Sequence, residues 1–435
     1  MIDGFAGTIL GPDSDEYLLA ATAYGKVGRP VLAARPTTAA DVAAAIAYAR
    51  AEGLVLSVRS GGHSPLNTND GGMVLDLSRI RDVEVQGGNL VRLGSGATWG
   101  SVAQELLEYD LAVSSGDTYS VGVGGLTLGG GIGWLVRQHG LAIDSLREAE
   151  VVLPSGAIVT ANESSEPELF WALRGGGGNF GVVTRFTFQA HPLRGVVFGT
   201  IDVQPARLAE TLPGWRDVMR AAPEKLNSTV YATPEFGPEM PATTKVLVCY
   251  GSADEDEAWS AIRPLLALPG VIGIGNDVEL KLFVEVFDEP SAPPGSIRIV
   301  DRNGFACDLD DTLIERVTTV NAALDSAVLM VRYLRGALNR VPTDATAFPH
   351  RDVEAFVMSA AFLPPDAPDE DERRILDGWA PVAERLTGTY GNFNLRAYPD
   401  VLDLMYPPAT MERLRAAKRR YDPDNVLAHN LNIVP

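Results

Sequence analysis

The chain has only two cysteines among its 435 residues, Cys249 and Cys307. Both have apolar neighbours, in VLVCY and GFAC, so we expect two buried thiols and no disulfide framework. The five histidines are scattered without the spacing of metal ligands, which argues against a metal enzyme. No GxSxG, HExxH, CxxC or Walker sequence occurs, so the sites that these motifs build are excluded.

Basic residues are also scarce. The chain has 36 lysines and arginines against 56 aspartates and glutamates, a formal net charge of −20. Nucleic acids and anionic membranes bind basic surfaces, so the charge argues against both as partners. An anionic cofactor would have to be held by backbone N–H groups more than by lysines. The N-terminal residues lack the features of a signal peptide and no apolar run approaches about 20 residues, so we expect a cytoplasmic protein with no membrane span.

The order of helix and strand signals predicts an α+β fold with more than one domain. A chain of 435 residues is too long for one ordinary core. Strand and helix signals alternate through the first third, and glycine clusters thin out near Pro192. From there to about Tyr390, amphipathic helices at Leu208 to Arg220 and elsewhere alternate with apolar strands. This pattern predicts an antiparallel sheet with helices on one face.

The hexapeptide RSGGHS, residues 59–64, follows a buried strand directly. Adjacent glycines let backbone N–H groups converge on an anion such as a pyrophosphate. Arg59 can add charge, and the two serines can donate hydroxyl hydrogen bonds. His63 lies in the loop itself, where it could ligate, act as a base or form a covalent bond. A turn with a surface histidine is the alternative.

Two further segments are rich in glycine. Residues Gly122 to Gly133 interleave glycine with apolar residues, which indicates packed backbone running close to a flat ligand rather than a flexible loop. Residues Gly175 to Gly181 contain a GxGxxG match. This match follows a helix and precedes a strand, the reverse of the order that a Rossmann nucleotide site requires, so we reject that interpretation.

Tyr390 and Asn392 stand two residues apart on a predicted strand and would project to the same face. A phenolate there could accept a proton from a substrate, and the amide could orient a ring edge. Ordinary polar residues of a strand are the alternative.

Together these motifs resemble one family. RSGGHS, GSGATWG, VGVGGLTLGGGIGWLVRQHG, RGGGGNFGVVT, YGNF and RYDPDNVLAHNLNI occur in this order along nearly the whole chain. They resemble the berberine bridge enzyme-like branch of the vanillyl-alcohol oxidase flavoproteins, which have a PCMH-type FAD-binding domain. The resemblance implies a two-part FAD-binding domain in residues 1–192, a substrate domain in 193–390, and a segment, 391–435, that returns to the FAD-binding domain.

The resemblance implies FAD as cofactor, bonded covalently from His63 Nδ1 to the 8α carbon of the flavin. Doubly linked relatives have a cysteine where this chain has Thr118, so we expect a single link. Val121 stands where the family has its oxygen-gate residue, and a small apolar side chain there is typical of oxidases. The other expected cofactor-binding residues are Arg59, Ser60, Gly61, Gly62, Ser64, Thr98, Gly116, Asp117, Gly122, Gly125, Gly129, Gly130, Gly133, Val183, Asn392, Asn430 and Asn432.

The resemblance further implies hydride transfer from a small alcohol, amine or natural-product substrate to the flavin, with O2 reduced to H2O2. Tyr390 would assist removal of the substrate's O–H or N–H proton, and Asn392 would contact the flavin edge. A flavin dehydrogenase with another electron acceptor and a non-catalytic flavin carrier are the alternatives. Arg335, His350 and Arg351 are candidates for the substrate pocket, and the oligomeric state stays open.

Overall fold

A short parallel sheet forms near the N-terminus of the computed structural model, which describes residues 2–274, 277–289, 298–324, 327–394 and 398–435. Helix α2 (Ala39–Ala51) begins where the Thr38 side chain accepts a hydrogen bond from the Asp41 N–H, as its sequence predicts. The sheet has the order β1-β4-β6-β5, and only β1 is antiparallel to its neighbour. Its strands are β1 (Thr8–Leu10), β4 (Leu32–Arg35), β5 (Leu56–Arg59) and β6 (Met73–Asp76).

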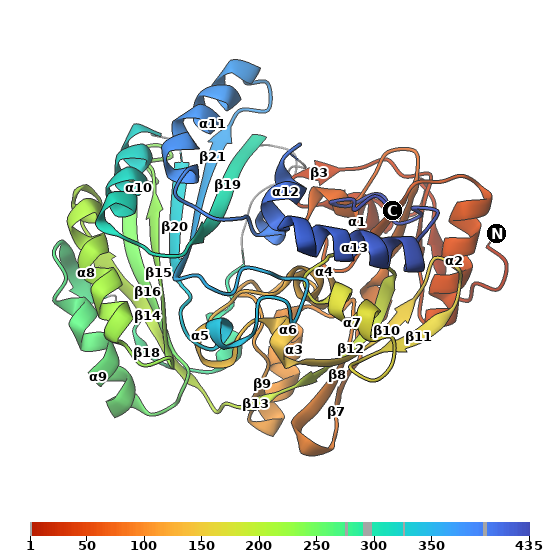
Figure 1. Ribbon diagram of the computed structural model, residues 1–435, viewed down its shortest axis with the longest axis horizontal. Helices are drawn as coiled ribbons and strands as arrows, with labels where there is room; N and C mark the ends of the chain where they lie inside the picture. Colours follow the sequence, from red (N-terminus) through yellow and green to blue (C-terminus); the bar gives the residue numbers. More distant parts are fainter. Residues whose placement is uncertain (1, 275–276, 290–297, 325–326, 395–397) are drawn as a thin grey trace.

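An antiparallel five-stranded sheet follows, with the order β11-β10-β12-β8-β7. Helix α3 (Trp99–Leu106) begins after Thr98, whose side chain accepts a hydrogen bond from the Ser101 N–H and caps the helix. Helix α7 (Pro167–Leu173) packs against α13 (Pro408–Tyr421), so the end of the chain lies against its first half, near the N-terminus (Figure 1). The strands are β7 (Val83–Val85), β8 (Leu90–Gly94), β10 (Leu146–Val152), β11 (Ile158–Ala161) and β12 (Val182–Gln189).

The third large sheet is antiparallel and carries its four long helices on one face, at the left of Figure 1. Its order is β17-β14-β16-β15-β20-β21-β19, with β18 paired to β14. This confirms the predicted α+β architecture. The strands are β14 (Val196–Val203), β15 (Leu226–Thr233), β16 (Thr243–Tyr250), β17 (Val271–Ile274), β18 (Glu279–Lys281), β19 (Arg298–Ala306), β20 (Ala327–Tyr333) and β21 (Ala355–Leu363). The helices are α8 (Leu208–Ala221), α9 (Glu255–Leu266), α10 (Asp311–Ala323) and α11 (Asp369–Ala383).

The alternation of side chains along the third sheet decides what its two faces contact. Leu329 and Val331 of β20 belong to the core beneath the helices. Met330, between them in sequence, packs instead with residues of the first half such as Ile132 and Leu141. The face without helices is therefore turned toward the first half of the chain.

Shorter elements connect these sheets. They are α1 (Tyr17–Ala21), β2 (Thr22–Ala23), β3 (Lys26–Val27), β9 (Leu111–Ala112), α4 (Val123–Gly129), α5 (Val136–His139), α6 (Ala142–Ser145), β13 (His191–Pro192) and α12 (Val401–Met405). Of the described helices, none combines the length and the apolarity that crossing a bilayer requires.

Several local expectations were wrong. The glycine-rich segment is closely packed as expected, since a Cβ on Gly124 would lie 2.4 Å from Ser95 Oγ, but the short helix α4 within it was not anticipated. Gly391–Phe393 form a 3-10 turn rather than a strand. Strands β14 and β19 and helix α11 were not anticipated. Cys249 is buried as expected, but Cys307 is exposed.

Candidate functional site

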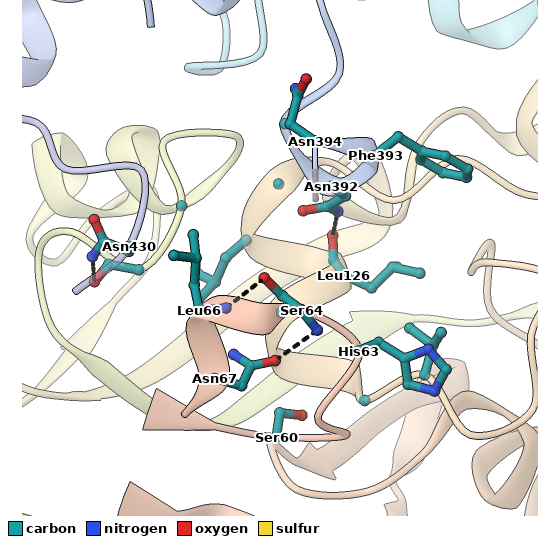
Figure 2. A pocket seen from close by; sticks show the side chains of 18 of the residues that line it. Ser60, His63, Ser64, Leu66, Asn67, Leu126, Asn392, Phe393, Asn394 and Asn430 are labelled. Atoms are coloured by element: carbon teal, nitrogen blue, oxygen red, sulfur yellow. Dashed lines mark hydrogen bonds between the residues drawn. The ribbon is translucent and has the colours of Figure 1, made fainter. Parts of the chain in front are cut away.

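A cavity of about 550 Å³ lies where the three sheets meet. Its described lining comes from the loop after β5, the segment around α4, the glycine turn before β12, the strands β19 to β21 and the C-terminal segment. Ser60 and His63 lie on one wall, and Asn392, Phe393 and Asn394 lie across from them (Figure 2). Residues more than 300 positions apart in the sequence thus face one space.

His63 presents one ring nitrogen to a fixed partner. Its Nε2 lies 2.8 Å from Ser120 Oγ, and its ring stacks on that of Tyr24 with centroids 6.0 Å apart. Burial lowers the pKa of His63, so the imidazole is neutral at pH 7. No described residue bonds Nδ1. A neutral imidazole with one held nitrogen and one available nitrogen therefore stands on the cavity wall.

The loop around His63 offers backbone donors. The N–H groups of Gly61, Gly62 and His63 have no acceptor among the described residues. Gly62 has a φ of +79°, which favours glycine, and a Cβ on Gly61 would lie 2.3 Å from the Gly122 N. Converging N–H groups of this kind bind anions. The predicted nest for a pyrophosphate is consistent with this geometry.

The two serines of the loop already make hydrogen bonds within the protein. The Ser60 hydroxyl donates to the Ser95 carbonyl at 2.6 Å and accepts from the Gly124 N–H at 3.3 Å. Its proton is therefore used within the fold. Ser64 Oγ accepts a bond from the Leu66 N–H at 3.3 Å, which leaves its own proton free to donate (Figure 2).

The structure brings most of the expected residues to the cavity and leaves five outside its lining. On the wall are Ser60, Gly61, Gly62, His63, Ser64, Gly116, Asp117, Thr118, Val121, Gly122, Gly125, Gly129, Val183, Tyr390, Asn392 and Asn430. Outside it are Arg59, Thr98, Gly130, Gly133 and Asn432.

These outer residues support the wall. Arg59 Nη1 lies 3.4 Å from Asp76 Oδ1, and its guanidinium lies so close to Gly62 that a Cβ there would be 2.8 Å from Nη2. Thr98 caps α3. A Cβ on Gly133 would lie 2.0 Å from the Ser115 carbonyl oxygen, so this glycine allows two backbones to approach.

Tyr390 and Asn392 form a hydrogen-bonded pair. The phenolic oxygen of Tyr390 accepts bonds from the Asn392 side-chain amide at 2.9 Å and from the Gly131 N–H at 3.0 Å. Burial raises the pKa of Tyr390 to about 12 in spite of these donors, which stabilise the phenolate. Because both bonds leave the phenol proton unused, Tyr390 can donate it to a group in the cavity, and the donors favour a phenolate if the proton leaves.

Asn303 of β19 holds the turn that carries Tyr390. Its Oδ1 accepts bonds from the Tyr390 N–H at 2.7 Å and from the Thr389 hydroxyl at 2.9 Å. Asn394 in turn donates to the Tyr390 carbonyl at 3.1 Å. All of these residues are buried. The turn is therefore fixed by the third sheet, a contact that no local sequence signal indicates.

An ion pair between a buried arginine and a half-buried aspartate joins the two halves of the chain beside the cavity. Arg332 of β20 pairs with Asp117 on the wall. Arg332 Nε also donates to Thr229 Oγ1 at 2.9 Å, and its guanidinium lies 4.8 Å from the centre of the Trp134 ring. The positive charge of Arg332 offsets the negative charge of Asp117 where the loop 116–118 meets the third sheet.

The third sheet supplies lining that sequence reasoning missed. The expected pocket residues Arg335, His350 and Arg351 do not line the cavity. Arg335 is exposed, while His350 Nε2 lies 3.0 Å from the Met405 carbonyl oxygen and Arg351 pairs with Asp144. Lining residues not anticipated include Tyr24, Asn67, Asn179, Tyr231, Asp288, Ile299, Asp301, Val328, Met358, Ala360, Phe362, Phe393, Met405, Tyr406 and His429.

The cavity offers a ligand backbone N–H groups in place of cationic side chains. No lysine or arginine occurs among its described lining residues, so the loop N–H groups are the anion donors. A Cβ at Gly125 or Gly178 would meet no atom within 4 Å, so the backbone there is open to a ligand. Asn430 Oδ1 is buried with no hydrogen-bond partner in the described structure, an acceptor that a bound ligand could satisfy.

Comparison with known proteins places these features in context. The FAD binding domain family matches residues 30–162, and the family "Berberine and berberine like" matches residues 389–434. The chain is 30% identical to (R)-6-hydroxynicotine oxidase of Paenarthrobacter nicotinovorans, over 99% of this chain and 97% of that protein.

Solved structures agree along the whole chain. The crystal structure of 6-hydroxy-D-nicotine oxidase from Arthrobacter nicotinovorans superposes with a TM-score of 0.85 at 29% identity, covering 99% of this chain and 98% of that one. Xylooligosaccharide oxidase from Myceliophthora thermophila C1, in complex with xylobiose, has a TM-score of 0.87 at 26% identity, with 99% and 97% covered.

Proposed function

The chain belongs to the berberine bridge enzyme-like FAD-linked oxidoreductases, and from this premise we propose that it is an oxidase with FAD bonded covalently to His63. We further propose that it oxidises a small alcohol, amine or natural-product compound and produces H2O2. The observation that carries the proposal is that His63 and the Tyr390–Asn392 pair line one cavity from opposite walls.

Within this proposal, residues 1–192 and 391–435 hold the cofactor, and residues 193–390 cover the substrate. Gly61, Gly62 and Ser64 bind the pyrophosphate through N–H groups and a hydroxyl. The available Nδ1 of His63 forms the covalent link. Thr118 has no thiol, so a second link does not form. The Oδ1 of Asn430, which has no partner among the described residues, accepts a hydrogen bond from the cofactor.

The chemistry that FAD supplies when bound is two-electron transfer from a substrate C–H bond to O2, which takes up two protons and leaves as H2O2. Tyr390, as the phenolate that the Asn392 amide and the Gly131 N–H stabilise, binds the substrate's hydroxyl or amine group and accepts its proton. Val121 is small enough to leave space for O2 beside the cofactor, which favours an oxidase over a dehydrogenase.

The experiment is a comparison of electron acceptors. Turnover of a substrate by the holoenzyme is measured in air, with H2O2 quantified, and under argon with a redox dye. We expect one H2O2 per substrate oxidised and faster turnover in air. Turnover with the dye and none with O2 would instead identify a dehydrogenase. Replacing Val121 with leucine, which fills the same wall with a bulkier apolar group, is expected to slow the reaction with O2 selectively.

A further inference from the structure

Three strands of the third sheet form a largely apolar floor for part of the cavity. Residues at alternate positions in parts of β19, β20 and β21 face the cavity and line it. The helices cover the opposite face of the same strands. The residues of this floor are Ile299, Asp301, Val328, Met358, Ala360 and Phe362, all of them apolar except Asp301. We infer that the substrate presents a flat, apolar aromatic body to this floor, and that a sugar does not fit it. The inference rests on the proposed function and specifies its substrate class.

The register of the strands places Ala360 in the middle of the floor. Ala360 lies opposite Val328 on one side and opposite Asp301 on the other. In the next row outward, Ile299 lies opposite Phe362. A methyl group between larger neighbours leaves a shallow hollow, which suits the face of a planar ring.

The floor runs from the proposed chemical centre toward the surface. Met358, at its inner end, lies opposite Asn303, the residue that holds the Tyr390 turn. Phe362, at the outer end, contacts Phe236 edge to face with ring centroids 5.6 Å apart, and Phe236 is 42% exposed. Four residue steps along a strand span about 13 Å. This length accommodates a compound of two rings.

Among the described residues of β19, β20 and β21 that line the cavity, only Asp301 is polar, which leaves most hydroxyls of a carbohydrate without a partner on this floor. A disaccharide presents several hydroxyls, and each one buried without a partner costs about 1–3 kcal/mol. An aromatic body instead gains from burying apolar surface, at roughly 25 cal/mol per Å². Phe393, beside Asn392 on the wall (Figure 2), adds an aromatic side near Tyr390, with ring centroids 5.7 Å apart. The floor thus discriminates for aryl compounds.

The test measures binding to the holoenzyme by calorimetry under argon, with two probes that resist oxidation at the reacting carbon: naphthalene-2-carboxamide and methyl β-cellobioside. We expect the amide to bind at least tenfold more tightly. Ala360→Phe, which fills the hollow, is expected to weaken amide binding at least tenfold. Ile272→Phe is the matched control, because Ile272 is 60% exposed on β17 of the same sheet. This control is expected to leave binding unchanged.

Equal or tighter binding of the cellobioside, no measurable binding of the amide, or unchanged amide binding in Ala360→Phe would overturn the inference. Flavin bleaching by aryl alcohols, aryl amines and disaccharides is recorded in parallel. Bleaching by a disaccharide, with H2O2 formed in air, would contradict the inferred aromatic substrate class and leave the proposed function standing. If the holoenzyme binds the amide but none of these compounds bleaches its flavin, the result would contradict the proposed function and leave the aromatic preference of the floor standing.

Discussion

The phenolic oxygen of Tyr390 accepts a hydrogen bond from the side-chain amide of Asn392 at 2.9 Å, although only Gly391 separates the two residues. A 3-10 turn makes this contact possible, since in a strand the two side chains would point the same way without meeting. The pair creates a phenol whose oxygen is already supplied with donors and whose proton is directed to the cavity.

Replacing Tyr390 with phenylalanine removes this phenol and keeps the ring. We expect the rate of substrate-driven flavin bleaching to fall about 100-fold or more, the usual worth of a positioned acid–base group. Stopped-flow absorbance under argon measures it. The variant should keep its full flavin content, and unchanged bleaching would show that Tyr390 takes no part in the reaction.

The pH dependence of the reaction should also report the ionisation of Tyr390. With a pKa raised to about 12, Tyr390 is almost wholly protonated at pH 7, and its phenolate fraction rises tenfold per pH unit below that pKa. We expect kcat/KM for an alcohol substrate to rise with unit slope from pH 7 to pH 10 without a plateau. The Tyr390→Phe variant should lose this slope. A plateau near pH 8 in the native enzyme would assign the proton transfer to another group.

Asn303 is expected to act as a positioning residue. Asn303→Leu removes the acceptor of the Tyr390 N–H, so we expect the free energy of unfolding to fall by about 2 kcal/mol and kcat to fall more than tenfold at nearly constant KM. Asn303→Asp keeps an acceptor and should restore kcat to within about threefold. If both variants lost stability but kept kcat, Asn303 would be purely structural.

Acid should destabilise the fold partly through His350. Burial lowers its pKa to about 4, so the folded state resists a proton that the unfolded chain accepts near pH 6.5. This contribution is complete above pH 6.5 and is lost as the pH falls toward 4. His350→Gln keeps a donor for the Met405 carbonyl and cannot titrate.

Chemical denaturation of both proteins at pH 7 and pH 4 measures the effect. We expect the native protein to lose up to about 3 kcal/mol more than His350→Gln across this range. The same loss in both proteins would show that His350 is not a source of the acid sensitivity.

Local signals predicted much of the cofactor half. Thr38 and Thr98 mark the helices that they cap, and the glycine pair after a buried strand identifies the loop of His63. These features depend on residues within a few positions of one another. The same loop also shows what local signals cannot predict. Only the folded structure reveals that the Ser60 hydroxyl donates to the Ser95 carbonyl and that Arg59 pairs with Asp76.

The substrate half was less predictable for two physical reasons. Strand β21 reads AFVMSAAFL, which is apolar on both faces, so a period of two cannot tell which residues face the cavity. Strand β19 contains Asp301 and Asn303 in its interior, and such residues are depleted in strands, so the strand signal there is weak. The hydrogen bond from the Tyr390 N–H to Asn303 joins residues 87 positions apart, so no local sequence pattern predicts it.

The central claim, a covalent bond between His63 and FAD, is tested most directly by acid precipitation of fully loaded protein followed by a peptide map. We predict that the yellow colour stays with the precipitate and that the peptide containing His63 carries the mass of FAD, while His63→Ala releases its flavin to the supernatant. Release of all the colour from the native protein, or a flavin on a peptide without His63, would contradict the account.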